Sequence, residues 1–250
     1  MAGTLYLVPN TLGPMDNAGD NPLASIIPAD VQLLTSQLTY FIAENAKTAR
    51  AFLKLLSATS PLANAIQDIR IAELDVNTKS NALPALLAPL LAGQDAGLIS
   101  EAGVPAVADP GANLVRLAHE HGVRVRPLVG PSSLLLAVMS SGLNGQSFAF
   151  NGYLPTDAAM RSKKIKSLED RSRAERQTQL FIETPYRNAA MLEALATQCR
   201  ATTLLCVATD LTLPTENIRT QTAANWKAAL AAGKTPDFHK KPTVFLLLAE

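Results

Sequence analysis

The sequence predicts an α/β protein built from two α/β domains. Short apolar runs of β-type residues alternate with helical patterns from one end of the chain to the other, and the loops between them are short. Hydrophobic residues make up 48% of the 250 residues and charged residues 17%, a globular composition with ample material for a buried core. Such a βα alternation is typical of a parallel sheet covered by helices on both faces.

The first domain is expected to span residues 1–145. Strands are predicted where apolar runs lie between turn residues, and helices where apolar residues recur with helical spacing. Pro84 suits the first turn of a helix, whereas Pro89 should kink or end that helix. The expected strands are 5–8, 40–43, 69–73, 97–100 and 123–129, and the expected helices are 47–56, 81–92, 112–121 and 132–141.

The second domain is expected to span residues 146–250 and to continue the same βα alternation. Trp226 lies on a short late helix, where it is interpreted as a packing anchor. The expected strands are 148–153, 179–183, 203–209, 218–222 and 243–249, and the expected helices are 158–175, 186–197 and 223–232.

Net charge, apolar runs and cysteines argue against three features: a general attraction to nucleic acid or membrane, a membrane-spanning helix and a metal site. The formal net charge of +1 provides no global field for nucleic acid or membrane, so a polyanionic substrate would need a local patch. No apolar run approaches the roughly 20 residues of a membrane-spanning helix. Cys199 and Cys206 form no CxxC pair, which argues against a metal site and fits reduced thiols in the cytoplasm.

Three loops carry the residues that suit a polar ligand. They are residues 9–16, 100–111 and 130–133, each following a predicted strand, and ligands bind beyond the carboxyl ends of such strands. Gly103 lets the backbone approach a ligand closely, and Ser132 and Ser133 stand beside free N–H groups of a helix start. Taken singly, each loop also suits a structural role, with Asp109 as a helix cap.

Together these loops resemble a known family. Residues 98–111, LISEAGVPAVADPG, resemble the SDAGTPLISDPG segment of the ribosomal RNA small-subunit methyltransferase I family, a branch of the tetrapyrrole-methylase superfamily. Other segments match in the same order along nearly the whole chain. They are LYLVP at 5–9, AEN at 43–45, VGPSS at 129–133, GYLP at 152–155 and FIETPYR at 181–187.

The resemblance implies two α/β domains with S-adenosyl-L-methionine in the cleft between them, usually in a homodimer. It implies methylation of ribosomal RNA at a cytidine-like ribose 2′-hydroxyl. The donor contacts that it implies are Pro9, Ser100, Glu101, Ala102, Gly103, Val107, Ala108, Ser132, Ser133, Ile182, Leu211, Pro242 and Thr243.

Glu183 and Arg187 are the candidate catalytic residues. They stand at the end of a strand and the start of a helix, where they would position the acceptor or exchange its proton. A structural ion pair across this strand-to-helix turn explains the same two residues equally well.

Two further alternatives stay open at this point. The family's His-Asp-His-Asn-Glu stretch is replaced by ELDVN at 73–77, which leaves room for a methyltransferase of tetrapyrroles or other small heterocycles, or for a donor-binding protein without catalysis. The basic stretch 161–176 would suit phosphate contacts. Its interleaved acidic residues favour instead a solvated helix face with i,i+4 ion pairs.

Overall fold

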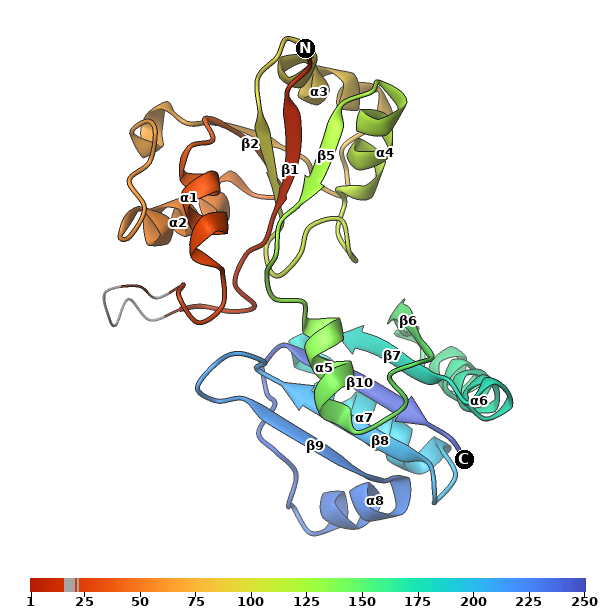
Figure 1. Ribbon diagram of the computed structural model, residues 1–250. Helices are drawn as coiled ribbons and strands as arrows, with labels where there is room; N and C mark the ends of the chain where they lie inside the picture. Colours follow the sequence, from red (N-terminus) through yellow and green to blue (C-terminus); the bar gives the residue numbers. More distant parts are fainter. Residues whose placement is uncertain (16–20, 22) are drawn as a thin grey trace. The chain divides into compact units, whose positions relative to one another are not determined.

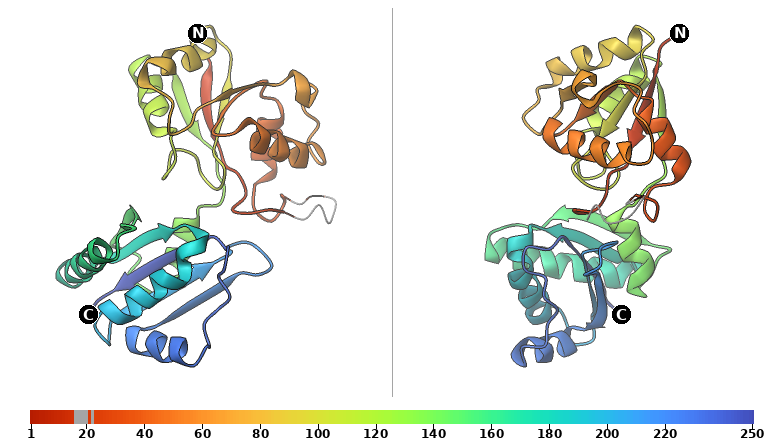
Figure 2. Two further views of the ribbon diagram at one scale, coloured as in Figure 1. Left: turned by 180° about the vertical axis from the view of Figure 1, so that it is seen from behind. Right: turned by 90° about the vertical axis from the view of Figure 1, so that its left-hand side faces the viewer.

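The computed structural model describes residues 1–15, 21 and 23–250, which form two units, Met1–Ser132 and Ser133–Glu250. Asp16, the last residue of the expected first loop, lies outside the described residues. Each unit has its own five-stranded sheet (Figures 1 and 2). Among the described residues, no helix combines the length and the apolar character needed to cross a membrane.

The first unit has an all-parallel sheet with the order β3-β2-β4-β1-β5. Its central strands β2 and β4 are apolar and buried throughout, as strands covered on both faces must be. The strands are β1 (Thr4–Val8), β2 (Tyr40–Ala43), β3 (Arg70–Glu73), β4 (Ala96–Ile99) and β5 (Arg124–Pro127), and the helices are α1 (Ala29–Ser36), α2 (Ala46–Ser57), α3 (Leu83–Leu91) and α4 (Ala112–Glu120).

Different helices cover the two faces of the first sheet. Phe41 and Ala43 pack with residues of α1 and α2, whereas Tyr40 and Ile42 pack with residues of α3 and α4. This follows from the alternation of side chains along β2. Figure 1 shows the two helix pairs on opposite sides of the sheet.

Local signals explain some helix ends in the first unit. The Asn45 side chain begins α2 by accepting hydrogen bonds from the N–H groups of Lys47 (2.8 Å) and Thr48 (3.4 Å). Helix α3 ends at Leu91, two residues beyond Pro89. Helix α4 begins after Gly111 with no side-chain cap, so the interpretation of Asp109 as a helix cap is wrong.

The second unit differs from the expected parallel pattern. Its sheet has the order β6-β7-β10-β8-β9, in which only β6 and β7 pair in parallel, and the other three pairs are antiparallel. Strand β10 lies between β7 and β8 and runs opposite to both. The strands are β6 (Phe148–Tyr153), β7 (Thr178–Glu183), β8 (Leu204–Thr209), β9 (Asn217–Thr222) and β10 (Thr243–Leu248), and the helices are α5 (Ser133–Ser141), α6 (Ala158–Glu175), α7 (Asn188–Gln198) and α8 (Ala223–Ala231).

Every expected strand and helix forms, with its ends shifted by no more than two residues. Helix α1 has no counterpart among the expected elements, because it is only eight residues long and too short for a clear periodicity.

Helix α5 lies in the second unit, although the expected domain boundary at residues 145 and 146 would place it in the first. It packs against β8, β9 and β10. Its last carbonyl, that of Ser141, also accepts a hydrogen bond from the Thr220 hydroxyl at 2.7 Å. The boundary between the two units is therefore set by contacts of α5 with distant residues. It does not fall at the short turn formed by residues 142–147.

Trp226 lies in the hydrophobic core of the second unit, which confirms its interpretation as a packing anchor. The side chain is fully buried, and its Nε1–H donates to the carbonyl of Leu205 at 2.9 Å. Phe181 and Phe245 stack in the same cluster with ring centroids 5.9 Å apart. The indole thus fills the space between α8 and β8.

We expect Trp226→Ala to lower the free energy of unfolding by about 3–5 kcal/mol, because it leaves a cavity and removes the Leu205 bond. Lys227→Ala, an exposed neighbour on α8, should change it by less than about 0.5 kcal/mol. Urea denaturation measures both values. Equal losses for the two variants would contradict the anchoring role.

Candidate functional site

The loops that follow β1 and β4 are joined by hydrogen bonds at the carboxyl edge of the first sheet. The N–H of Asn10 donates to the carbonyl of Gly103 (2.8 Å), and the N–H of Gly103 donates to the carbonyl of Thr11 (3.2 Å). The buried Asn10 side chain donates to the carbonyls of Ser100 (3.0 Å) and Glu101 (3.1 Å). Parallel pairing of β1 with β4 brings these strand ends together.

The loop after β5 packs against the other two. A Cβ atom at Gly130 would overlap the ring of Pro9, and one at Gly103 would come within 3.4 Å of the Pro131 carbonyl. Only glycine permits the approach at residue 130. Pro9, the segment Ser100–Gly103 and residues 130–131 therefore form one loop cluster, as the sequence predicts for neighbouring strand ends.

The long loop after β4 holds an uncommon backbone conformation. Ala106 and Ala108 both have a φ of 65°, in the left-handed region that alanine rarely adopts. Such residues cost on the order of 1–3 kcal/mol each and cluster at functional sites. Val107 and Ala108, two expected donor contacts, are exposed in this segment.

Acidic side chains surround the loop cluster. Burial raises the pKa of Glu44 above its ordinary value, and the negative charges of Asp109, Glu101 and Asp75 raise it further. Burial also raises the pKa of Asp109, with part of the rise offset by a hydrogen bond with Ser100 and some added by Glu101. The edge therefore favours a ligand that carries positive charge.

A cavity of about 290 Å³ opens beside this cluster, at the lower end of the range for small-molecule sites. Its walls come from the first loop and from α2, with Phe52 and Leu55 on the apolar side. The Thr48 hydroxyl donates to Oε2 of Glu101 at 3.1 Å, so a carboxylate is held in the polar side of the wall.

In the second unit, the expected donor contacts meet at the edge of the sheet where β7 and β8 end and β10, the strand between them, begins. Thr243, the first residue of β10, is in register with Glu183 on one side and Thr209 on the other. The N–H of Asp210 donates to the carbonyl of Pro242 at 3.0 Å. Ile182, Leu211, Pro242 and Thr243 thus come from three adjacent strands and their loops.

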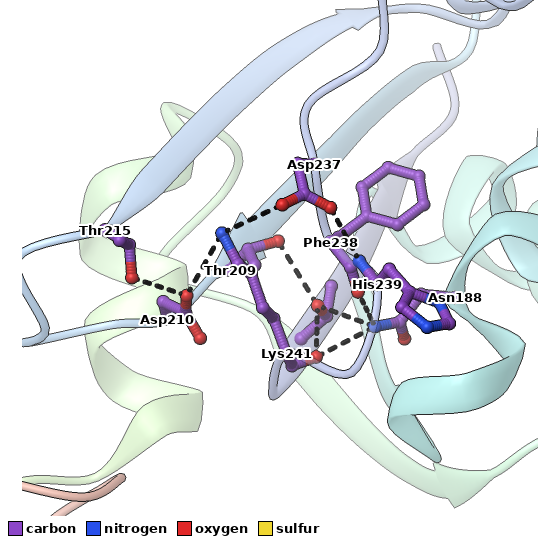
Figure 3. A network of polar contacts seen from close by, with 9 residues as sticks. Asn188, Thr209, Asp210, Thr215, Asp237, Phe238, His239 and Lys241 are labelled. Carbon is purple, nitrogen blue, oxygen red and sulfur yellow. Dashed lines mark hydrogen bonds and ion pairs between the residues drawn. The ribbon is translucent and has the colours of Figure 1, made fainter.

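A polar network supports this edge (Figure 3). The Asn188 side chain, which is buried, donates to the carbonyls of Phe238 (2.9 Å) and Lys241 (2.8 Å) and to the Thr243 hydroxyl (3.1 Å). Lys241 Nζ lies 3.6 Å from Asp210. These contacts fix the segment that leads into β10.

Two buried polar atoms at or next to this edge have no hydrogen-bond partner among the described residues. They are the amide oxygen of Asn188 and the hydroxyl of Thr212, a residue with a φ of 71° that follows Leu211 directly. Buried polar atoms are nearly always paired, so both are available to a ligand or to water.

Glu183 and Arg187 form an ion pair with a separation of 2.6 Å, of which the Glu183 side chain is 1% exposed and the Arg187 side chain 30% exposed. The other carboxylate oxygen of Glu183 accepts from the N–H of Thr184 at 2.7 Å. The ion pair that the turn suggested is present. Both oxygens of Glu183 are engaged, while the guanidinium reaches the surface.

The structure thus brings most of the expected site residues together in two sets, Pro9 and Ser100–Gly103 in the first unit, and Ile182, Glu183, Leu211, Pro242 and Thr243 in the second. Ser132 ends the first unit, and Ser133 begins α5 in the second. Sequence reasoning missed Asn10, Glu44, Asn188 and Asp210. Asn10 stood in a loop already singled out, but the partners of Asn188 lie at least 50 residues away and left no local signal.

Residues 31–226 match the family described as Tetrapyrrole (Corrin/Porphyrin) Methylases. The chain belongs to this family. The resemblance drawn from the sequence motifs is confirmed, and so is the two-part α/β fold.

Relatives with a more specific name align over much of the chain. The "Ribosomal RNA small subunit methyltransferase I" of Mesorhizobium japonicum is 40% identical over 157 residues, 61% of this chain and 51% of that protein. The protein of the same name from Xylella fastidiosa is 30% identical over 229 residues, 92% of this chain and 76% of that protein. The chain therefore spans about half to three quarters of these relatives.

Solved structures share the fold. The methyltransferase CobJ superposes with a TM-score of 0.61 at 16% identity, covering 99% of this chain and 95% of its own. Uroporphyrin III C-methyltransferase from Thermus thermophilus superposes with a TM-score of 0.55 at 17% identity, covering 98% of this chain and 97% of its own. At these identities the likeness concerns the fold alone.

We expect Gly130→Ala to weaken S-adenosylmethionine binding by roughly tenfold or more, about 1.4 kcal/mol, because the new methyl group would displace the Pro9 loop. Isothermal titration measures the affinity. Gly145→Ala is the control, since its Cβ would come no closer than 3.7 Å to Val138. Unchanged affinity in Gly130→Ala would remove this loop from the donor site.

We expect Asp109→Asn to raise the melting temperature of the donor-free protein at pH 7. The pKa of Asp109 is raised by folding, so its contribution to stability is full below its ordinary pKa and is lost as the pH rises through the raised value. Asparagine does not ionise, so the gain should shrink towards zero as the pH falls. Thermal melts across pH test this, with the exposed Asp68→Asn as control; a gain independent of pH would contradict it.

Proposed function

We propose that the chain is an S-adenosylmethionine-dependent methyltransferase that acts on small-subunit ribosomal RNA, with a cytidine-like ribose 2′-hydroxyl as acceptor. The observation that carries the proposal is the loop cluster of Pro9, Ser100–Gly103 and residues 130–131, formed at the carboxyl edge of the sheet in a tetrapyrrole methylase fold. The names of the relatives support the RNA acceptor.

The residues present fit the methyl donor. S-adenosylmethionine carries a positive sulfonium and a positive amino group, which suit the carboxylates of Glu44, Glu101 and Asp109. Its ribose and adenine offer hydrogen-bonding groups for the unpartnered Thr212 hydroxyl and Asn188 amide oxygen. The proposal keeps all thirteen expected donor contacts, most of them through backbone atoms.

When bound, the donor supplies a methyl group already activated by its sulfonium. The protein's task is therefore to place the acceptor hydroxyl in line with that group, and positioning alone can supply much of the acceleration. Arg187 is proposed to bind an RNA phosphate with its exposed guanidinium. Glu183, both of whose oxygens are occupied, is proposed to orient Arg187.

The proposal includes a homodimer as the working form and the cytoplasm as its location. The two cysteines are consistent with a reducing compartment. Both are free and buried, and burial raises the pKa of Cys199 to about 12, with the Glu169 charge adding to the rise. Neither thiol is therefore reactive near neutral pH.

The direct test is transfer of labelled methyl groups from S-adenosylmethionine to small-subunit ribosomal RNA that lacks the modification. We expect labelled nucleotides whose 3′ linkage resists alkali, as 2′-O-methylation requires. Label in a small heterocycle but never in RNA would favour the alternative acceptor. Donor binding without transfer to either would indicate a binding protein that lacks catalysis.

We expect Arg187→Ala to lower kcat/KM for RNA by about 10–100-fold, because a charge-assisted phosphate contact is lost. Glu183→Gln should give a smaller loss, since the guanidinium remains but is held less firmly. Donor affinity should stay within about twofold in both. Arg116→Ala, from an exposed i,i+4 pair with Glu120, is the control; an equal loss there would remove the specific role of Arg187.

A further inference from the structure

Helix α6 carries the densest positive charge of the chain. Its stretch from Arg161 to Arg176 contains seven basic and three acidic residues, a net charge of +4, whereas the formal net charge of the whole chain is +1. The remainder of the chain is therefore net −3. The basic residues are Arg161, Lys163, Lys164, Lys166, Arg171, Arg173 and Arg176.

The acidic residues of α6 do not neutralise its surface as i,i+4 pairing would. Glu169 is buried, and its Oε1 accepts from the N–H of Arg200 at 2.7 Å and from the Thr203 hydroxyl. Glu175 pairs with Arg171 at 3.2 Å, and this is the only ion pair of α6 among the described residues. Asp170 is thus left as the one exposed acidic side chain of the helix without a basic partner.

The buried positions explain which way the helix faces. Ile165, Leu168, Glu169 and Ser172 are spaced by three and four residues and form the face that packs on the second core. Lys163 lies on the opposite face, and Lys164 and Lys166 flank it on either side; all three are exposed and without an ion pair among the described residues. Arg176, also exposed, follows the end of the helix.

We propose that this exposed face of α6, the α6 lysine face, binds the phosphate backbone of the RNA acceptor. The inference rests on the proposed function. It adds a surface that contacts nucleotides of the RNA other than the one that is methylated. The three lysines lie within one turn of α6, at most about 5 Å apart along the helix axis, so they form one local cluster of positive charge. Phosphate contacts of this kind position an RNA without reading its sequence.

Electrostatics explains why the surface is confined to one helix. A protein with a net charge near zero gains no general attraction to a polyanion, so binding must come from cations gathered in one place. The acidic groups around Glu44 and Asp109 belong to the first unit and suit a cationic donor. The two ligands of the proposed reaction, of opposite charge, would thus have separate surfaces of matching charge.

The test compares two triple variants that change net charge equally. One is Lys163→Gln/Lys164→Gln/Lys166→Gln, and the other is Lys54→Gln/Lys79→Gln/Lys227→Gln, whose lysines are exposed elsewhere. Affinity for the small-subunit RNA transcript is measured over a range of salt concentrations, with donor titration and circular dichroism as checks. Glutamine is a good helix former, so α6 should remain folded.

We expect the α6 variant to bind RNA at least tenfold more weakly at low salt. The slope of log affinity against log salt should fall by roughly 2–3, about 0.7–0.9 for each lost phosphate contact. The control variant should bind like the unmodified protein, and both should bind S-adenosylmethionine normally. This combination supports the proposal.

RNA affinity of the α6 variant equal to that of the control would overturn the inference. Continued methyl transfer to RNA in that case would leave the proposed function standing. An unmodified protein that binds no RNA would overturn the inference as well, and the separate transfer assay decides whether the proposed function fails with it.

Discussion

The buried side chain of Asn10 is the contact on which the loop cluster of the first unit depends. Its amide donates to two carbonyls of the loop after β4, while its oxygen accepts from the N–H of Thr11 at 2.8 Å. A buried amide with all these bonds made is worth far more than its surface counterpart, because each lost partner would leave a desolvated carbonyl. The same loop after β4 also contains the two alanines with positive φ, at residues 106 and 108.

In the second unit, the segment that leads into β10 depends on Asn188 in a comparable way. Asn188 is the first residue of α7. Its amide donates hydrogen bonds to three acceptors in the segment that leads into β10. Because β10 is inserted between β7 and β8, that segment arrives beside Glu183 and Asp210. The amide thus ties the start of α7 to the segment before β10, and that segment in turn holds the loop after β8 through the Asp210 N–H and the Lys241 ammonium.

Charge is distributed so that a nearly neutral chain has two opposite local fields. Carboxylates gather at the carboxyl edge of the first sheet, where burial and mutual repulsion raise the pKa of Glu44 and Asp109. Three lysines are exposed on α6, while Glu169 lies on the buried side of the same helix. This separation matches the cationic donor and the polyanionic acceptor of the proposed function, and net charge alone does not reveal it.

The sequence by itself determined every strand and every α-helix except α1, the family and the loops of the first unit. Apolar runs such as residues 40–43 and 96–99 are unambiguous because both faces of a central parallel strand are buried, and strand ends of a parallel sheet must share an edge. Only the tertiary structure decided the antiparallel pairing of the second sheet, the membership of α5 and the roles of Asp109, Glu169 and Asn188. Strand direction depends on the neighbour that each strand finds, and a buried polar side chain depends on partners tens of residues away. Local residue propensities therefore predict neither the strand direction nor these partners.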